Sequence, residues 1–124
     1  MEGVKLARTD ATVARVIPIY FWKTRDDINI EKLERVARER GEKQAVGFFL
    51  DLTALLSSDR RLSEWSNRFR DHRFRTHDFF ETPATRFTEA LAEKRTPDVA
   101  RKWGFKMNME LSSFESQFRK FVDG

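Results

Sequence analysis

The chain has 124 residues, of which 40% are hydrophobic and twelve are phenylalanine, and this composition predicts one folded domain and excludes a disordered chain. It contains no cysteine, which excludes disulfides, thiolate metal sites, iron–sulfur clusters and cysteine nucleophiles. No apolar run is long enough for a signal peptide or a membrane span, so we expect a soluble cytoplasmic protein without membrane contact.

The positive charge is concentrated in one stretch of the chain. Lysine and arginine together number 24 against 20 acidic residues, which gives a net charge of +4. Residues 1–59 contain ten side chains of each sign and are neutral. Residues 60–75 contain six arginines against Glu64 and Asp71, so this stretch alone carries +4. We call it the arginine segment.

Two helices are predicted in the first third of the chain. Apolar residues recur at helical spacing behind a Thr9/Asp10 cap, and we expect a helix over at least residues 17–24. Pro18 lies inside this pattern, so a kinked helix and a strand followed by a helix both remain open. The second helix begins at Asp27 or Asn29 and ends at Gly41, where a left-handed residue is favoured.

The next segment, EKQAVGFFLDLTALL, predicts the central buried helix because it has almost no polar face. Gly47 within it predicts that a neighbouring helix crosses closely at that point. A further helix with Ser57 or Ser58 as its cap is expected to bury Leu62, Trp65 and Phe69. From residue 73 onward the pattern alternates with a period of two, which indicates an extended segment.

The last third predicts three short helices and one strand. Thr82-Pro83 and Thr96-Pro97 resemble helix starts, because threonine suits the cap and proline the first turn. FKMNMEL alternates like a short strand. Ser112-x-x-Glu115 is typical of a capping box that opens a helix with an apolar stripe of Phe114, Phe118 and Phe121. The predicted fold class is mainly α, a single compact multi-helix domain over residues 1–124, with at most one short two-stranded β element.

The arginine segment is the candidate nucleic-acid surface. A helix that continued through the whole segment would place Arg61, Arg68 and Arg75 on one stripe, where guanidinium groups could pair with phosphates and phenylalanines could stack on bases. The alternative is that the arginines are solvated or paired with acids and the phenylalanines belong to the core. The candidate residues are Arg60, Arg61, Arg68, Arg70, Arg73 and Arg75.

Catalytic and metal sites receive less support from the sequence. Arg70 and His77 fit the loose R-x(4–6)-H spacing of HEPN-type ribonucleases, in which such a pair acts on the 2′-hydroxyl and the scissile phosphate. His72 and His77 lie five residues apart, which is no familiar ligand spacing, and we expect no metal and no cofactor. The chain has neither a glycine-rich phosphate loop nor a nucleophile elbow.

A protein partner is the competing hypothesis. The Phe114, Phe118 and Phe121 stripe has the spacing of a helix face that docks into a partner's groove, although such stripes more often face their own core. This hypothesis predicts a homo-oligomer or hetero-oligomer and no salt-sensitive affinity for nucleic acid.

Two stretches resemble the C-terminal region of AbiEi-type antitoxins. IPIYFWKTRDDINIEKLERVARERGEKQAVGFFLDLTALL, residues 17–56, is similar to its succession of a helix after a proline, a charged helix and an apolar helix. RKWGFKMNM, residues 101–109, resembles its short terminal strand, with Trp103 and Asn108 at matching places. The resemblance implies a basic module that supports repression and antitoxicity in a toxin–antitoxin or defence system. The operator-binding winged helix of these antitoxins has no counterpart before the first predicted helix.

Overall fold

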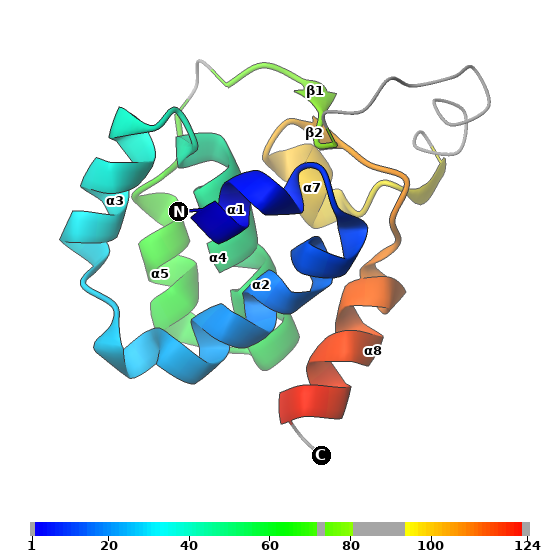
Figure 1. The fold of residues 1–124 in the computed structure, drawn as a ribbon, viewed down its shortest axis with the longest axis horizontal. Helices are drawn as coiled ribbons and strands as arrows, with labels where there is room; N and C mark the ends of the chain where they lie inside the picture. The colour runs from blue at the N-terminus through cyan, green and yellow to red at the C-terminus, as the bar shows by residue number, and fades with distance from the viewer. Residues whose placement is uncertain (1, 72–73, 81–93, 123–124) are drawn as a thin grey trace.

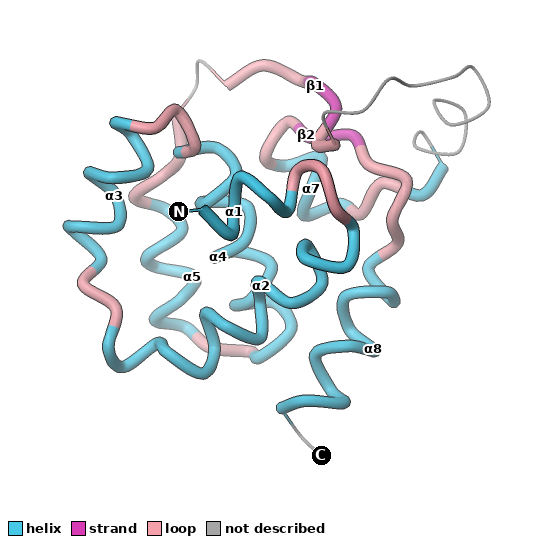
Figure 2. Tube along the Cα trace, viewed as in Figure 1, coloured by secondary structure: helices cyan, strands magenta, loops and turns pink. Residues whose placement is uncertain are grey.

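The computed structural model describes residues 2–71, 74–80 and 94–122, and it is mainly helical (Figures 1 and 2). The predicted fold class is therefore confirmed. The elements in chain order are α1 (Glu2–Ala7), α2 (Ala11–Thr24), the 3₁₀ turn η1 (Arg25–Asp27), α3 (Ile30–Glu39), α4 (Lys43–Ser57), α5 (Arg60–Asn67), β1 (His77–Asp78), α7 (Asp98–Lys102), β2 (Phe105–Lys106) and α8 (Leu111–Val122).

Helix α4 is the centre of the fold, with α2, α3, α5 and α7 packed around it (Figure 1). Its residues 45–54 are all buried, which confirms the predicted central helix. Phe48 lies among four other phenylalanine rings at centroid distances of 5.1–6.4 Å, in tilted and edge-to-face arrangements that aromatic pairs prefer. Those four rings are Phe49, Phe79, Phe105 and Phe114. These five phenylalanines thus form one aromatic core around α4.

Local capping signals explain where α2 and α3 begin and end. The Asp10 side chain accepts a hydrogen bond from the Thr12 amide and caps α2, which continues through Pro18 as one helix. The alternative of a strand before Pro18 is therefore wrong. Asn29 accepts from the Lys32 amide at the start of α3, and Gly41 has a φ of 69° beyond its end, both as predicted.

Two starts of helices differ from the prediction. Helix α1 was not expected; it buries Val4 and Ala7. Helix α5 is capped by Asp59, whose carboxylate accepts from the Leu62 amide at 3.0 Å, and not by Ser57 or Ser58. Ser58 is left-handed, with φ 57°, and it ends α4, so the first residue with the extended backbone that a cap requires is Asp59.

The polar residues before α7 and α8 also act differently from the prediction. The Thr96 hydroxyl accepts from the Met107 amide and donates to the Met107 carbonyl, so it ties two segments together and does not cap α7. Helix α8 begins at Leu111, which places Ser112 inside its first turn and makes the predicted capping box wrong. Thr82-Pro83 and the helix predicted after it lie outside the described residues.

The predicted β element is only a two-residue contact. Strand β1 pairs in parallel with β2, with His77 opposite Phe105, and the Phe79 amide donates to the Lys106 carbonyl at 2.8 Å. Burial alternates beyond β2 through Met107 and Met109, as the FKMNMEL pattern predicts, but without further strand pairing. No helix within residues 2–71, 74–80 and 94–122 combines the length and apolar character needed to cross a membrane.

Candidate functional site

Gly47 in the middle of α4 faces the ring of Trp103. A Cβ added to Gly47 would overlap the indole and would lie 2.8 Å from Cβ of Phe69. The predicted close approach at Gly47 is therefore present, but its partner is a tryptophan at the end of α7 and not a crossing helix. The absence of a side chain at Gly47 gives Trp103 room to reach α4. Trp103 is only 1% exposed.

Polar contacts fix the same indole. Its Nε1 donates to Oδ2 of Asp51 at 2.8 Å, one helical turn after Gly47. The Lys102 ammonium lies 2.9 Å from the same oxygen. A buried carboxylate needs such partners, since an unpaired charge away from water is strongly unfavourable. Gly47 and Asp51 together form a slot for Trp103 on α4.

The second half of the arginine segment is attached to this slot. The Arg70 guanidinium lies 5.4 Å from the centroid of the Trp103 ring, and the Phe74 ring lies 6.1 Å from it. The Gln44 amide donates to the carbonyls of Arg75 and Trp103, at 3.2 and 2.6 Å. The side chains of Arg70 and Arg75 are exposed, and neither forms an ion pair with any described residue. The structure thus holds the backbone and leaves these two guanidinium groups in solvent.

Two of the three arginines in the first half of the segment form ion pairs. Arg61 donates to Asp26 at 2.8 Å, and this hydrogen bond holds the pKa of the Asp26 carboxyl below its ordinary value of 3.8. Nε of Arg68 lies 3.7 Å from Glu34. Arg60 is exposed and has no ion pair among the residues that the structure describes. Two of the six predicted site residues therefore already have carboxylate partners.

The end of α5 separates these two halves. Beyond Asn67 the backbone tightens into i→i+3 hydrogen bonds, from the amides of Arg68, Phe69 and Arg70. This turn carries Phe69 fully into the core. A continuous helix through residue 75 is consequently not formed, and the stripe of Arg61, Arg68 and Arg75 is not formed either. Helix α5 is about 12 Å long, so Arg60 and Arg61 lie at the opposite end of α5 from the turn that leads to Arg70.

The remaining predicted residues are Arg73, the two histidines and the proposed catalytic pair. Arg73 and His72 lie outside the described residues. Arg70 follows α5 and His77 belongs to β1, so the two members of the proposed catalytic pair come from different elements. The ribonuclease hypothesis stays a prediction, tested by whether His77→Ala removes metal-independent RNA cleavage.

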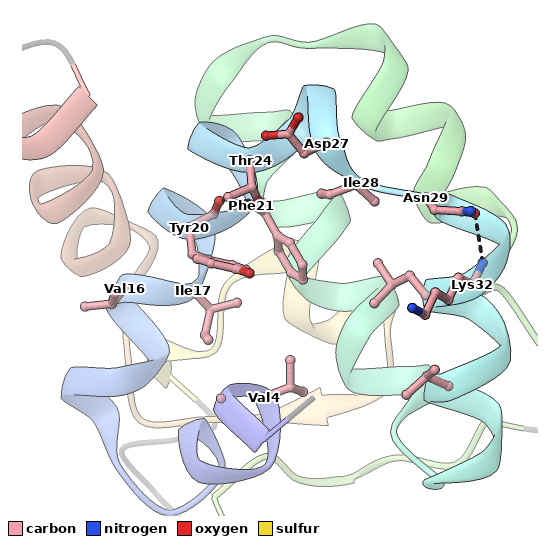
Figure 3. A pocket seen from close by; sticks show the side chains of 13 residues that line it. Val4, Val16, Ile17, Tyr20, Phe21, Thr24, Asp27, Ile28, Asn29 and Lys32 are labelled. Atoms are coloured by element: carbon pink, nitrogen blue, oxygen red, sulfur yellow. Dashed lines mark hydrogen bonds between the residues drawn. The ribbon is translucent and has the colours of Figure 1, made fainter.

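A groove lined by the first three helices was missed by the sequence analysis. It has a volume of about 830 Å³ and lies between α1, α2, η1 and α3 (Figure 3). Val4, Ile17 and Phe21 are buried beneath it, whereas Tyr20 on its rim is 60% exposed. The sequence offered one signal for the groove, which is the pair of large apolar residues Val16 and Tyr20, one turn apart on α2. The structure leaves both of these side chains exposed.

Comparison with known proteins finds no relative: no family model, curated protein or solved structure matches the chain.

Proposed function

We propose that the chain is a small cytosolic binding module that contacts nucleic-acid phosphates through the Arg70 and Arg75 end of the arginine segment. The observation that carries the proposal is the exposed Arg70 guanidinium, which lies over Trp103 and has no carboxylate partner among the described residues. The resemblance to AbiEi-type antitoxins suggests a role in a toxin–antitoxin or defence system.

Pre-organisation favours this end of the segment. Trp103 is fixed by Asp51 and by the slot at Gly47, so the ring beneath Arg70 is rigid. An arginine stacked on a rigid ring loses less side-chain entropy when it binds, and its N–H groups still point outward for two parallel bonds to a phosphate. Arg61 and Arg68, in contrast, each lie beside a carboxylate, whose negative charge weakens their attraction for a phosphate. Phe74, half-buried beside Trp103, is the aromatic side chain at this end on which an unpaired base could stack.

The test is the salt dependence of binding to a labelled oligonucleotide, single-stranded and duplex, followed by fluorescence anisotropy. For the parent protein the logarithm of the affinity should fall linearly with the logarithm of the salt concentration. Arg70→Glu with Arg75→Glu should weaken binding at least about tenfold and lower the slope by about two, one unit for each lost phosphate contact.

A matched control makes the same charge change elsewhere. Lys23→Glu with Lys120→Glu alters two exposed cations on α2 and α8, which lie away from the 74–80 segment (Figure 1). This control should keep the parent's slope. Equal losses in both double variants would mean that only net charge matters, and an unchanged Arg70/Arg75 variant would refute the proposal.

A protein partner is the second candidate function, and it is supported by the end of the α8 stripe. Phe114 and Phe118 are buried in the core, but Phe121 is 47% exposed. Light scattering across a range of protein concentrations should detect a homo-oligomer, and Phe121→Asp should then dissociate it. A concentration-independent monomer mass would remove self-association through this residue.

A further inference from the structure

The groove is closed at both ends by the chain itself. Its walls are α2 and α3, which are joined by η1 with residues 28 and 29, and that connection closes one end, at the top of Figure 3. Gly3 and Val4 of α1 close the other end. A partner helix needs an open channel to lie in, so this shape suits a compact ligand better. The volume of about 830 Å³ falls in the range of about 300–1,000 Å³ typical of small-molecule sites.

The chemistry of the lining is that of a site for an amphiphile. Apolar side chains form the walls and the base of the groove, among them Ile17, Phe21 and Leu33. Tyr20 and Lys32 come from facing walls, and Figure 3 shows the Tyr20 hydroxyl and the Lys32 amine both directed toward the space between α2 and α3. Lys32 has no ion pair with any described residue. An anionic group at this position would supply both with a partner.

The acidic residue among the described lining residues, Asp27, lies at the η1 end of the groove. Asp27 belongs to η1, and Figure 3 shows its carboxylate directed away from the space between the walls. A cationic head group would have to sit at this end and outside the apolar part. The positions of the two charges therefore favour an anionic head beside Lys32 with its chain against the buried residues.

We propose that the groove binds an aliphatic monocarboxylate, with the chain on Ile17 and Phe21 and the carboxylate between Lys32 and Tyr20. The site is independent of the arginine segment, since none of its lining residues belongs to residues 60–75. Transfer of each methylene from water to an apolar surface should strengthen binding up to about fourfold. The gain should end once the groove is full, because further carbons stay in water.

The experiment is calorimetric titration of the full chain with hexanoate, octanoate and decanoate below their micelle concentrations. Decanol and decyltrimethylammonium serve as neutral and cationic probes of the same chain length. Decanoate should bind with a saturable 1:1 isotherm, at least about tenfold more tightly than either probe. Absence of saturable binding, or equal affinity for decanol, would overturn the proposal.

Variants locate the ligand. Val36→Trp places a large ring in the groove and should abolish decanoate binding, with Ile28→Phe as a second filling variant should the first fail to fold. Lys32→Met should remove the preference of decanoate over decanol, whereas Lys23→Met on the same part of the molecule, but outside the groove, should keep it. Binding that survives both filling variants overturns the proposal. So does a parent dimer that Val36→Trp dissociates, because the occupant would then be a second copy of the chain.

Discussion

The two sides of the helical bundle differ in how closely their elements pack. On the α7 side, α4 has a glycine where Trp103 enters, and both the indole and the Lys102 ammonium contact Oδ2 of Asp51. On the α1–α2–α3 side, a groove lies between α2 and α3, and Tyr20 and Val16 stay exposed at it. Close packing stabilises the fold around Trp103, whereas the open side leaves space next to α2 and α3. The same substitution should therefore have opposite effects on the two sides.

Removal of an aromatic ring should produce the largest difference. Trp103→Ala leaves a cavity against Gly47 and deprives Asp51 of its indole donor, so we expect a loss of about 3–5 kcal/mol in the free energy of unfolding. Tyr20→Ala on the open side should change it by less than about 0.5 kcal/mol, since that ring is 60% exposed. Urea denaturation of both variants measures the difference. Similar losses would show that the two sides are equally packed.

Addition of one methyl group on the α7 side should also destabilise the fold. Alanine has the better helix propensity, but in Gly47→Ala its Cβ overlaps the Trp103 ring, and we expect a net loss of about 1–3 kcal/mol. A double-mutant cycle identifies the cause. In the Trp103→Ala background the substitution should become neutral or stabilising. A loss that persists there would assign the clash to Phe69 instead.

The same substitution on the open side should stabilise. A Cβ at Gly3 would lie 3.3 Å from Cδ1 of Ile17, the flexible end of a side chain that borders the groove and can shift into it. The gain in helix propensity should then dominate, up to about 1 kcal/mol. Thermal unfolding of Gly3→Ala measures it. A decrease in Tm would mean that Ile17 cannot move and that the groove is less accommodating than its volume indicates.

The smallest expected effect concerns the ion pair beside the groove. The pKa of Asp26 is lowered in the folded protein, so its pair with Arg61 stabilises the fold above the ordinary aspartate pKa of 3.8 and loses that contribution as the pH falls through the lower folded value. The pair is exposed, so the effect is small. Arg61→Met should lower Tm slightly near pH 6 and not at all near pH 2, whereas Arg60→Met, which removes an arginine without an ion pair among the described residues, should show no such dependence.

The sequence by itself determined the local elements. Helix periodicity and the caps at Asp10, Asn29 and Gly41 act within a few residues, and they predicted α2, α3 and α4 correctly. The unbroken apolar character of α4 likewise identified the centre of the core. The cap of α5 was misjudged because Ser57, Ser58 and Asp59 are all good caps, and the turn from α4 into α5 decided among them.

Only the tertiary structure decided how the candidate sites are arranged. Asp51 and Trp103 are 52 positions apart, and Arg61 and Asp26 are 35 apart, so no local pattern pairs them. The sequence shows the arginine segment as one charge cluster, but α5 ends where Phe69 enters the core, and only Arg61 and Arg68, before that point, have ion pairs among the described residues. The groove depends on the angle between α2 and α3. Both helices pack against α4, and this packing sets the angle between them.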